Sequence, residues 1–190
     1  MDFAVSSRPP NQDLMFLRLD LFLFLIHSVF RFIPNYISEV LSMRVASLED
    51  AILLAAHLHK SQKDKADKHY ILHPLRVMLN PILLTDEEHI TGVLHDTVED
   101  CSITIGQLKL LGYSDAIVEA LSFITKLPEE EDDYDAFIAR ICGGPLIARK
   151  VKLADLYDNA DFSRLPNPTE KDFKRHEKYL RAIALLEATL

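Results

Sequence analysis

The chain has 190 residues, of which 48% are hydrophobic and 26% charged, and this composition excludes wholesale disorder. Its two cysteines, Cys101 and Cys142, are too few for a disulfide framework or a zinc ribbon, so a reducing, cytoplasmic setting is expected. A formal net charge of −8 argues against duplex nucleic acid as the main partner. It does not argue against a small phosphorylated ligand, because a metal ion can supply local positive charge.

Residues 1–42 read as an N-terminal extension whose composition differs from that of the rest of the chain. They hold most of the phenylalanines and one apolar run, Leu21–Ile26. A membrane span needs about 20 mostly apolar residues, so this run is too short to cross a bilayer. Three interpretations stay open: an amphipathic helix packed on the domain or a membrane surface, a loosely attached extension, or sequence upstream of a natural start at Met43.

From Met43 to residue 190 the pattern predicts one domain made of short helices, with no convincing strand and no internal repeat. Four segments of the capping-box type open helices, each with a Ser or Thr followed three positions later by an acidic residue or Gln. They begin at Ser47, Thr85, Thr104 and Thr169. The predicted helices cover 51–61, 74 to about 80, Thr85 through Thr97, Thr104 to Gly112, Ser114 through Ile124, 134–141, Pro145 to about 160, and the segment after Thr169. Residues 128–133 are predicted to be a solvated acidic loop, and the fold class is all-α.

The most informative pattern is a set of His and Asp residues. His95-Asp96 follows apolar residues within a predicted helix, where an unpaired charge would be costly to bury. Glu99 and Asp100 lie four residues after His95 and Asp96, so a helix would place the three carboxylates and the imidazole on one side. Carboxylates so close repel one another unless a cation holds them. The mixed nitrogen and oxygen donors suit Mn²⁺, Fe²⁺ or Zn²⁺.

Two further segments fit this set. His73 stands directly before Pro74, at the start of a predicted helix. Asp155 lies in the apolar stretch 151–155, where a lone carboxylate is out of place, and Asn159 follows it on the same helix face. Each residue alone has an ordinary explanation, but the order His, His-Asp, Asp is hard to obtain by chance.

That order resembles the HD superfamily of metal-dependent phosphohydrolases, and more closely the hydrolase domain of RelA/SpoT proteins and the small single-domain alarmone hydrolases. The family pattern H-x-x-Q-x-R-K-x-G-x-P-Y-I-x-H-P is similar to residues 59–74 of this chain. The family's H-D-x-x-E-D and K-L-A-D-x-x-x-N are matched at 95–100 and 152–159, and its Thr-Lys-Leu at 125–127. The resemblance covers about residues 47–187 and implies a compact HD-domain bundle.

The resemblance also implies an activity and a set of roles. The family cleaves the 3′-pyrophosphate from (p)ppGpp, giving GDP or GTP and pyrophosphate. Carried over by motif position, one divalent metal, first of all Mn²⁺, is expected on His73, His95, Asp96 and Asp155. The attacking water is expected to be positioned and activated by Glu99 and Asp100. The nucleotide pocket is expected to include Lys65, Tyr70, Lys126 and Asn159, with Arg140 and Lys152 supplying further positive charge.

Departures from the family pattern bear on the substrate. Asp64 stands where the family usually has arginine, and Asp67 and His69 replace its Gly and Pro. An aspartate can neither stack on a base nor pair with phosphate as arginine does, so looser substrate selectivity is expected. The stretch 133–140 resembles a divergent group of RelA/SpoT-like HD proteins instead of the standard alarmone hydrolases.

Two alternatives to (p)ppGpp hydrolysis stay open: an HD phosphohydrolase of another nucleotide, and a non-catalytic nucleotide-sensing or protein-interaction module. The presence of Glu99 and Asp100 argues against the second, since a pure binder needs neither. A synthetase activity is not expected. The sequence carries no signal for an oligomeric state.

Overall fold

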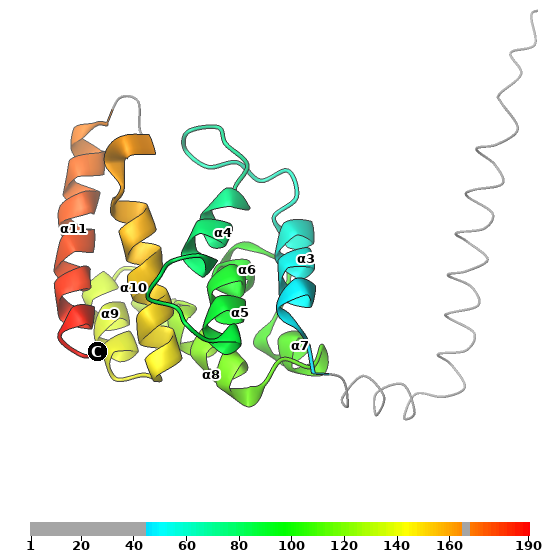
Figure 1. Ribbon diagram of the computed structural model, residues 1–190. Helices are drawn as coiled ribbons and strands as arrows, with labels where there is room; N and C mark the ends of the chain where they lie inside the picture. Colours follow the sequence, from blue (N-terminus) through cyan, green and yellow to red (C-terminus); the bar gives the residue numbers. More distant parts are fainter. Residues whose placement is uncertain (1–44, 165–167) are drawn as a thin grey trace, which may run out of the picture. The chain divides into compact units, whose positions relative to one another are not determined.

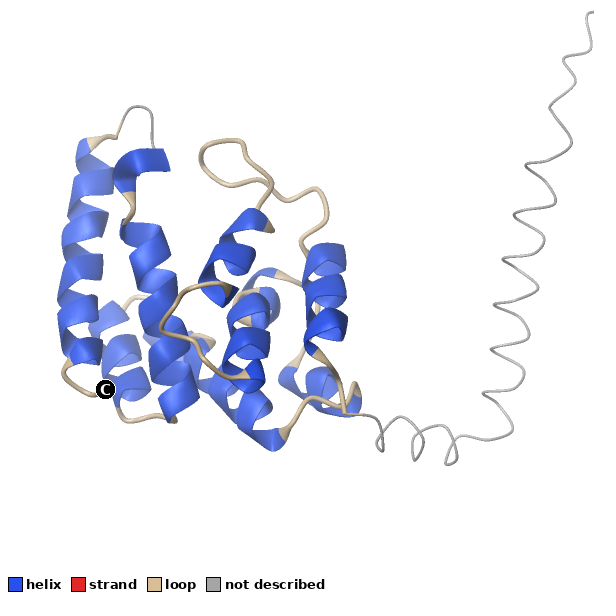
Figure 2. Cartoon of the chain, in the orientation of Figure 1, coloured by secondary structure: helices blue, strands red, loops and turns tan. Residues whose placement is uncertain are grey.

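A computed structural model describes residues 45–164 and 168–190, and in this part of the chain every regular element is helical (Figure 1, Figure 2). The α-helices are α3 (Leu48–Leu58), α4 (Leu72–Met78), α5 (Asp86–Leu94), α6 (Thr97–Asp100), α7 (Ile105–Leu110), α8 (Asp115–Ile124), α9 (Tyr134–Cys142), α10 (Leu146–Ala160) and α11 (Glu170–Glu187), with 3₁₀ turns η1 (Pro128–Glu130) and η2 (Phe162–Arg164). The all-α prediction is confirmed. None of the described helices is long and apolar enough to cross a membrane. The predicted extension 1–42 and its boundary lie outside the described residues.

Side-chain caps start the helices where the sequence predicts them. At the start of α3, the Ser47 hydroxyl accepts a hydrogen bond from the backbone N–H of Asp50, and the Asp50 carboxylate accepts one from Ser47 N–H. The same reciprocal pair opens α5 and α7, and at α11 the Asp172 carboxylate accepts from both the backbone N–H and the hydroxyl of Thr169. Because each cap directly precedes its helix, α3 begins at Leu48 and not at the predicted Ala51.

Helices α5 and α10 pack at the centre of the bundle, and α3, α4, α8, α9 and α11 each contact one or both of them, whereas α7 packs on α8. Helix α5 contacts α3, α4, α8 and α10, whereas α10 also contacts α9 and α11. Gly92 lets α4 approach α5 closely, since a Cβ at this position would lie 3.1 Å from the Met78 Cα. The side chains of Val93, Leu94 and Val151 are fully buried in the core between these helices. The core thus fixes the spacing between α4, α5 and α10.

The third predicted helix is shorter than expected. It ends at Leu94 instead of running through Thr97, and a turn at His95 and Asp96 separates it from α6. Two side chains take the carbonyl groups that a continuing helix would use: His95 Nδ1 donates to Gly92 O at 2.8 Å and Thr97 Oγ1 donates to Leu94 O at 2.6 Å. The His-Asp pair therefore lies on a turn between two helices.

The acidic segment 128–133 is only partly the solvated loop that was predicted. Its first residues form η1, and Glu130 is 6% exposed. Glu130 is buried because the Arg140 guanidinium supplies its ionic partner, with Nε to Oε1 at 2.6 Å. Within this run of acidic residues, the Glu130 carboxylate is therefore buried and has a structural role.

Candidate metal centre and cleft

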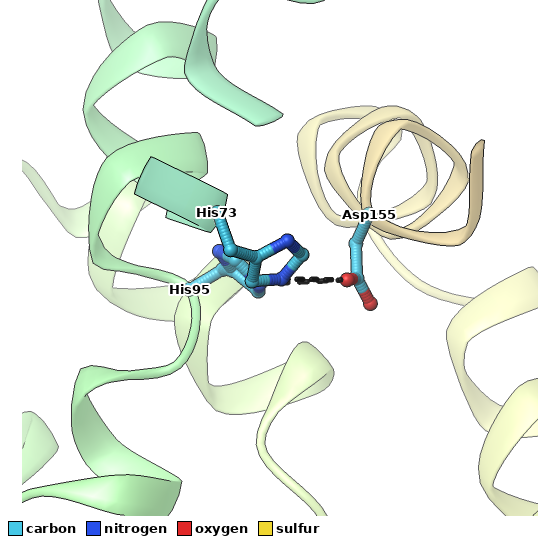
Figure 3. Close-up of side chains that lie close together, drawn as sticks. All are labelled: His73, His95 and Asp155. Carbon is cyan, nitrogen blue, oxygen red and sulfur yellow. Dashed lines mark ion pairs between the residues drawn. The ribbon is translucent and has the colours of Figure 1, made fainter. Parts of the chain in front are cut away.

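Four side chains from α4, from the turn after α5 and from α10 meet at one point. His73 lies on the first turn of α4, His95 on the turn after α5, and Asp155 in the middle of α10 (Figure 3). Asp96 follows His95 on the same turn. His73 Nε2 is 3.2 Å from Asp155 Oδ1 and 3.4 Å from Asp96 Oδ2. His95 Nε2 is 3.0 Å from Asp96 Oδ2 and 3.6 Å from Asp155 Oδ1. The structure thus brings together all four residues predicted to hold a metal.

Both imidazoles are held by their other nitrogen, which turns Nε2 toward the common point. His73 Nδ1 donates to Asp158 Oδ2 at 2.6 Å, and Arg76 holds the same carboxylate through Nε at 2.6 Å. His95 Nδ1 donates to the Gly92 carbonyl, which can only accept. Outer hydrogen bonds of this kind are what orient histidine ligands in metal sites.

The donor set fits a divalent cation. Among the described residues, the buried His95 Nε2 faces the carboxylates of Asp96 and Asp155 but has no partner in hydrogen-bond geometry, so its lone pair is available to a cation. His73, His95 and Asp155 each offer a ligand atom within 4.8 Å of one another. Burial lowers the pKa of His73, but hydrogen bonds to Asp155, Asp158 and Asp96 outweigh it and raise the pKa to about 11. The carboxylates around His73 therefore favour positive charge at this point.

Asp155 is a buried carboxylate, and both of its oxygens accept hydrogen bonds from neighbouring side chains. It is 4% exposed, and its neighbours Leu153, Ala154 and Leu156 are buried in the core. Lys152 Nζ donates to Asp155 Oδ2 at 2.7 Å, and the Asn159 amide donates to Oδ1. Burial alone would raise the pKa of Asp155, but the Lys152 charge and the two imidazoles hold it well below its usual range. Lys152 and Asn159, predicted as substrate residues, therefore contact a predicted metal ligand.

Tyr70 supports Asp96 in the same way. Its hydroxyl donates to Asp96 Oδ2 at 2.6 Å. Burial and the charge of Asp96 raise the pKa of Tyr70 far above its ordinary value, so the hydroxyl stays protonated and donates. Tyr70 thus acts on the carboxylate as well as lining the space in front of it.

A cleft of about 520 Å³ opens over this centre. Its lining includes His73, Asp96 and Asp155 of the metal centre. The other predicted residues that line it are Lys65, Tyr70, Glu99, Lys126, Lys152 and Asn159. The Glu99 carboxylate accepts a hydrogen bond from Lys126 N–H at 3.3 Å. Desolvation raises the pKa of Glu99 above its ordinary value, which suits a group that accepts a proton.

Three predicted site residues do not line the cleft: His95, which is buried at the metal centre, Asp100 and Arg140. The Asp100 carboxylate accepts from Gln62 Nε2 at 3.4 Å, and Asp100 is exposed. Arg140 donates to Glu130 and to the carbonyl groups of Phe123 and Thr125. This placement corrects the expectation that Arg140 supplies charge to a substrate, because its donors are used within the protein.

The departures near residue 64 form a self-contained loop at the edge of the cleft. Asp64 Oδ1 accepts from the backbone N–H groups of Ala66 at 2.9 Å and Lys68 at 2.8 Å. Asp67 has φ 57°, in the left-handed region where the family pattern has glycine. Although Asp64 lines the cleft, its carboxylate is occupied in closing the loop, and Lys63 and Lys65 beside it carry positive charge into the lining.

Sequence reasoning missed a wall of the cleft that comes from two later helices. We call it the α9–α11 wall, and it comprises Tyr134, Phe137, Arg175, Lys178 and Tyr179. Lys178 Nζ lies 4.0 Å from the centroid of the Tyr134 ring, and Lys152 Nζ lies 5.2 Å from that of Phe137. Desolvation and repulsion from Lys126 lower the pKa of Lys178. Arg175, Lys178 and Tyr179 share one face of α11 by their spacing, but this spacing alone does not distinguish a cleft wall from a solvated helix face.

Comparison with known proteins gives the family. The chain is 34% identical over 146 residues to the Mus musculus guanosine-3′,5′-bis(diphosphate) 3′-pyrophosphohydrolase MESH1, covering 70% of this chain and 79% of that protein. It is 28% identical over 120 residues to the Aquifex aeolicus protein named guanosine-3′,5′-bis(diphosphate) 3′-pyrophosphohydrolase, covering 59% of this chain. It is 32% identical over 82 residues to a GTP pyrophosphokinase of Myxococcus xanthus, covering 42% of this chain. The chain spans only 17% and 11% of these two bacterial proteins.

A solved structure supports the same fold. It is described as a metazoan ortholog of SpoT that hydrolyses ppGpp, and it matches with a TM-score of 0.65 and 20% identity over 77% of this chain and 88% of that one. No model of a protein family matches the chain. Because the mouse relative shares 34% identity and the chain covers 79% of its length, the chain belongs to the RelA/SpoT-like family of HD-type hydrolases.

Proposed function

We propose that the protein is a metal-dependent phosphohydrolase that removes pyrophosphate from the 3′ position of a (p)ppGpp-type nucleotide. The observation that carries this proposal is the meeting of His73, His95, Asp96 and Asp155 at one point below a cleft with several cationic side chains. The activity named for the mouse and Aquifex aeolicus relatives supports the choice of substrate.

His73, His95, Asp96 and Asp155 would hold one divalent ion, Mn²⁺ in the first place, with Fe²⁺ or Zn²⁺ as alternatives. When bound, such an ion polarises a phosphoryl oxygen and lowers the pKa of a water molecule. The protein's own contribution is to fix the four donors before any ion arrives. Lys152, Asn159 and Tyr70 do this by bonding to the carboxylates.

Glu99 is the proton acceptor in this proposal. Its carboxylate lines the cleft within one turn of Asp96, and its raised pKa increases its basicity toward an attacking water. Asp100 follows it but faces Gln62, so we assign Asp100 a secondary part in water activation. Lys65, Lys126 and the α9–α11 wall offer donors to the phosphates, and Asn159 lies where it can also meet the ribose.

The decisive experiment measures pyrophosphate release from ppGpp by the purified full chain, with Mn²⁺ and with a chelator. We expect release only with the metal, and no release by a His95→Ala variant. Absence of release by metal-loaded wild-type protein contradicts the proposal.

One observation favours a second candidate, an HD phosphohydrolase of a different nucleotide. Asp64 occupies the family's arginine position and its carboxylate closes a loop, so no guanidinium is available there for a guanine base. A panel of guanine and adenine nucleotides, pyrophosphorylated and monophosphorylated, distinguishes the two. Binding without turnover of any member of the panel would instead indicate a nucleotide-sensing module.

A further inference from the structure

The Arg140 side chain makes four hydrogen bonds within the protein. Its Nε and Nη2 donate to the two carboxylate oxygens of Glu130 at 2.6 and 2.7 Å. Nη1 donates to Phe123 O at 2.9 Å and Nη2 to Thr125 O at 3.0 Å. Such a fork of donors is specific to arginine, because a lysine presents a single ammonium group. One side chain of α9 therefore holds the end of α8 and the residue that follows it.

Glu130 holds the other side of the same segment. Besides pairing with Arg140, its Oε2 accepts from Leu127 N–H at 3.0 Å. Glu130 is 6% exposed, and the hydrogen bonds from Arg140 lower its pKa. The backbone from Phe123 to Leu127 is thus fixed at three points by one buried ion pair.

The middle of this segment faces the cleft. The backbone N–H of Lys126 donates to Glu99 Oε2 at 3.3 Å. The Lys126 side chain lines the cleft, with Nζ 5.8 Å from the centroid of the Phe137 ring. A shift of this backbone would therefore move both the Lys126 side chain in the cleft and the N–H that binds Glu99.

We propose that Arg140 and Glu130 are positioning residues, whose buried ion pair places Lys126 so that its N–H orients Glu99 and its ammonium faces the phosphates. The inference rests on the proposed function, because Glu99 and Lys126 act in that reaction. Loss of the pair allows the segment to shift, and misplacement of reacting groups by about 1 Å can cost about a hundredfold in rate.

The chain contains a matched control for Glu130. Glu88 is 4% exposed, pairs with Lys150 through Oε1 at 2.6 Å, and accepts from Leu84 N–H at 2.6 Å through Oε2. Glu88 thus combines a buried ion pair with a backbone hydrogen bond, as Glu130 does, but it lies at the start of α5, outside the lining of the cleft. Glu130→Gln and Glu88→Gln are expected to lower the melting temperature by similar amounts.

Of these two glutamate variants, only Glu130→Gln is expected to reduce kcat, by about tenfold to a hundredfold, with bound metal unchanged. Two variants of Arg140 separate the effect of its positive charge from the effect of its several hydrogen bonds. Arg140→Lys keeps a cation beside Glu130 but cannot reach both carbonyl groups, so we expect it to recover stability relative to Arg140→Met without recovering kcat. If kcat follows melting temperature across all four variants, the pair is only structural and the proposal is overturned.

Backbone amide hydrogen exchange gives a readout that needs no substrate. Exchange over Phe123–Leu127 should become faster in Glu130→Gln and Arg140→Met and stay at the wild-type rate in Glu88→Gln. Unchanged exchange in the first two variants overturns the positioning role. If wild-type protein with Mn²⁺ fails to hydrolyse ppGpp, the proposed function is contradicted, while the exchange experiment still decides whether the ion pair positions the segment.

Discussion

The floor of the cleft and its α9–α11 wall differ in charge. The floor, formed by His73, His95, Asp96 and Asp155, presents two carboxylates and two imidazole nitrogens at one point, an arrangement that suits a cation. The wall presents Lys178, whose pKa is lowered by desolvation and by repulsion from Lys126, and Arg175, which pairs with Asp172, and its positive charge suits an anion. A phosphorylated substrate needs both, because its phosphates carry negative charge to the wall while a bound metal meets one of them at the floor. The predictions below separate the two regions.

Neutralising the floor should have the largest effect. Asp155→Asn removes a charged ligand, so we expect loss of bound metal and of turnover, as measured by elemental analysis and pyrophosphate release. Glu88→Gln is the control, because it also neutralises a buried carboxylate that pairs with a lysine. Full metal occupancy in Asp155→Asn would show that the floor is not a metal site.

Removing the proton acceptor should act on chemistry alone. Glu99→Gln is expected to slow turnover by about 10²- to 10⁴-fold while bound metal and substrate affinity stay near wild-type levels. Asp100→Asn should cost less, since Asp100 does not line the cleft. A larger loss in Asp100→Asn would reverse the two roles, and a wild-type rate in Glu99→Gln would remove Glu99 from the mechanism.

Changing the wall should affect binding more than chemistry. Lys178→Met keeps the length of the side chain but removes its charge, so KM should rise about tenfold with little change in kcat, consistent with one charge-assisted hydrogen bond to phosphate. Lys174→Met on the exposed side of α11 is the matched control, as its ammonium pairs with Glu170. An unchanged KM in Lys178→Met argues that the phosphates do not reach the wall.

The pH dependence of the rate should report Glu99. Desolvation raises its pKa, and a protonated Glu99 cannot accept a proton, so kcat/KM should fall with decreasing pH through a value above the ordinary glutamate pKa of about 4.3. Metal occupancy is measured at each pH, because protonation of the histidines also releases metal. An acid limb at or below the ordinary value, with metal still bound, contradicts the prediction.

The smallest effect is expected from residues 1–42. None of the proposed metal ligands, carboxylates or cations lies in them, so a chain that begins at Met43 should retain metal and turnover. Loss of folding on truncation would instead show that the Leu21–Ile26 run belongs to the core.

The sequence predicted the floor far better than the wall, for a physical reason. His95, Asp96 and Asp155 are polar residues in apolar stretches, and such conflicts are visible without a structure. His73 was assigned from its place in the motif order. The cations of the wall look like the solvated face of an ordinary amphipathic helix, so Lys178 and Arg175 gave no conflict to notice. Only the packing of α11 against α9 and α10 shows that this face borders a cleft.

Arg140 and the break after Leu94 show where local reasoning fails. Arg140 was expected in the substrate site, because charge on a helix near the motif was needed and its partner Glu130 was hidden in an acidic run. The helix was expected to continue through Thr97, yet side chains of His95 and Thr97 take its carbonyl groups. Both outcomes depend on hydrogen bonds between side chains and backbone that helical periodicity does not encode.

The positions of the two proposed histidine ligands depend on the packing of α4 against α5 at Gly92. The glycine carbonyl fixes His95, and the absence of a side chain lets α4, which carries His73, lie against α5 with the two imidazole centroids 5.1 Å apart. A methyl group at position 92 would have to push α4 outward by tenths of an ångström, which is the scale on which metal–ligand bond lengths differ between divalent ions. We therefore expect Gly92→Ala to change which divalent ion the proposed centre prefers, although Gly92 supplies no ligand atom.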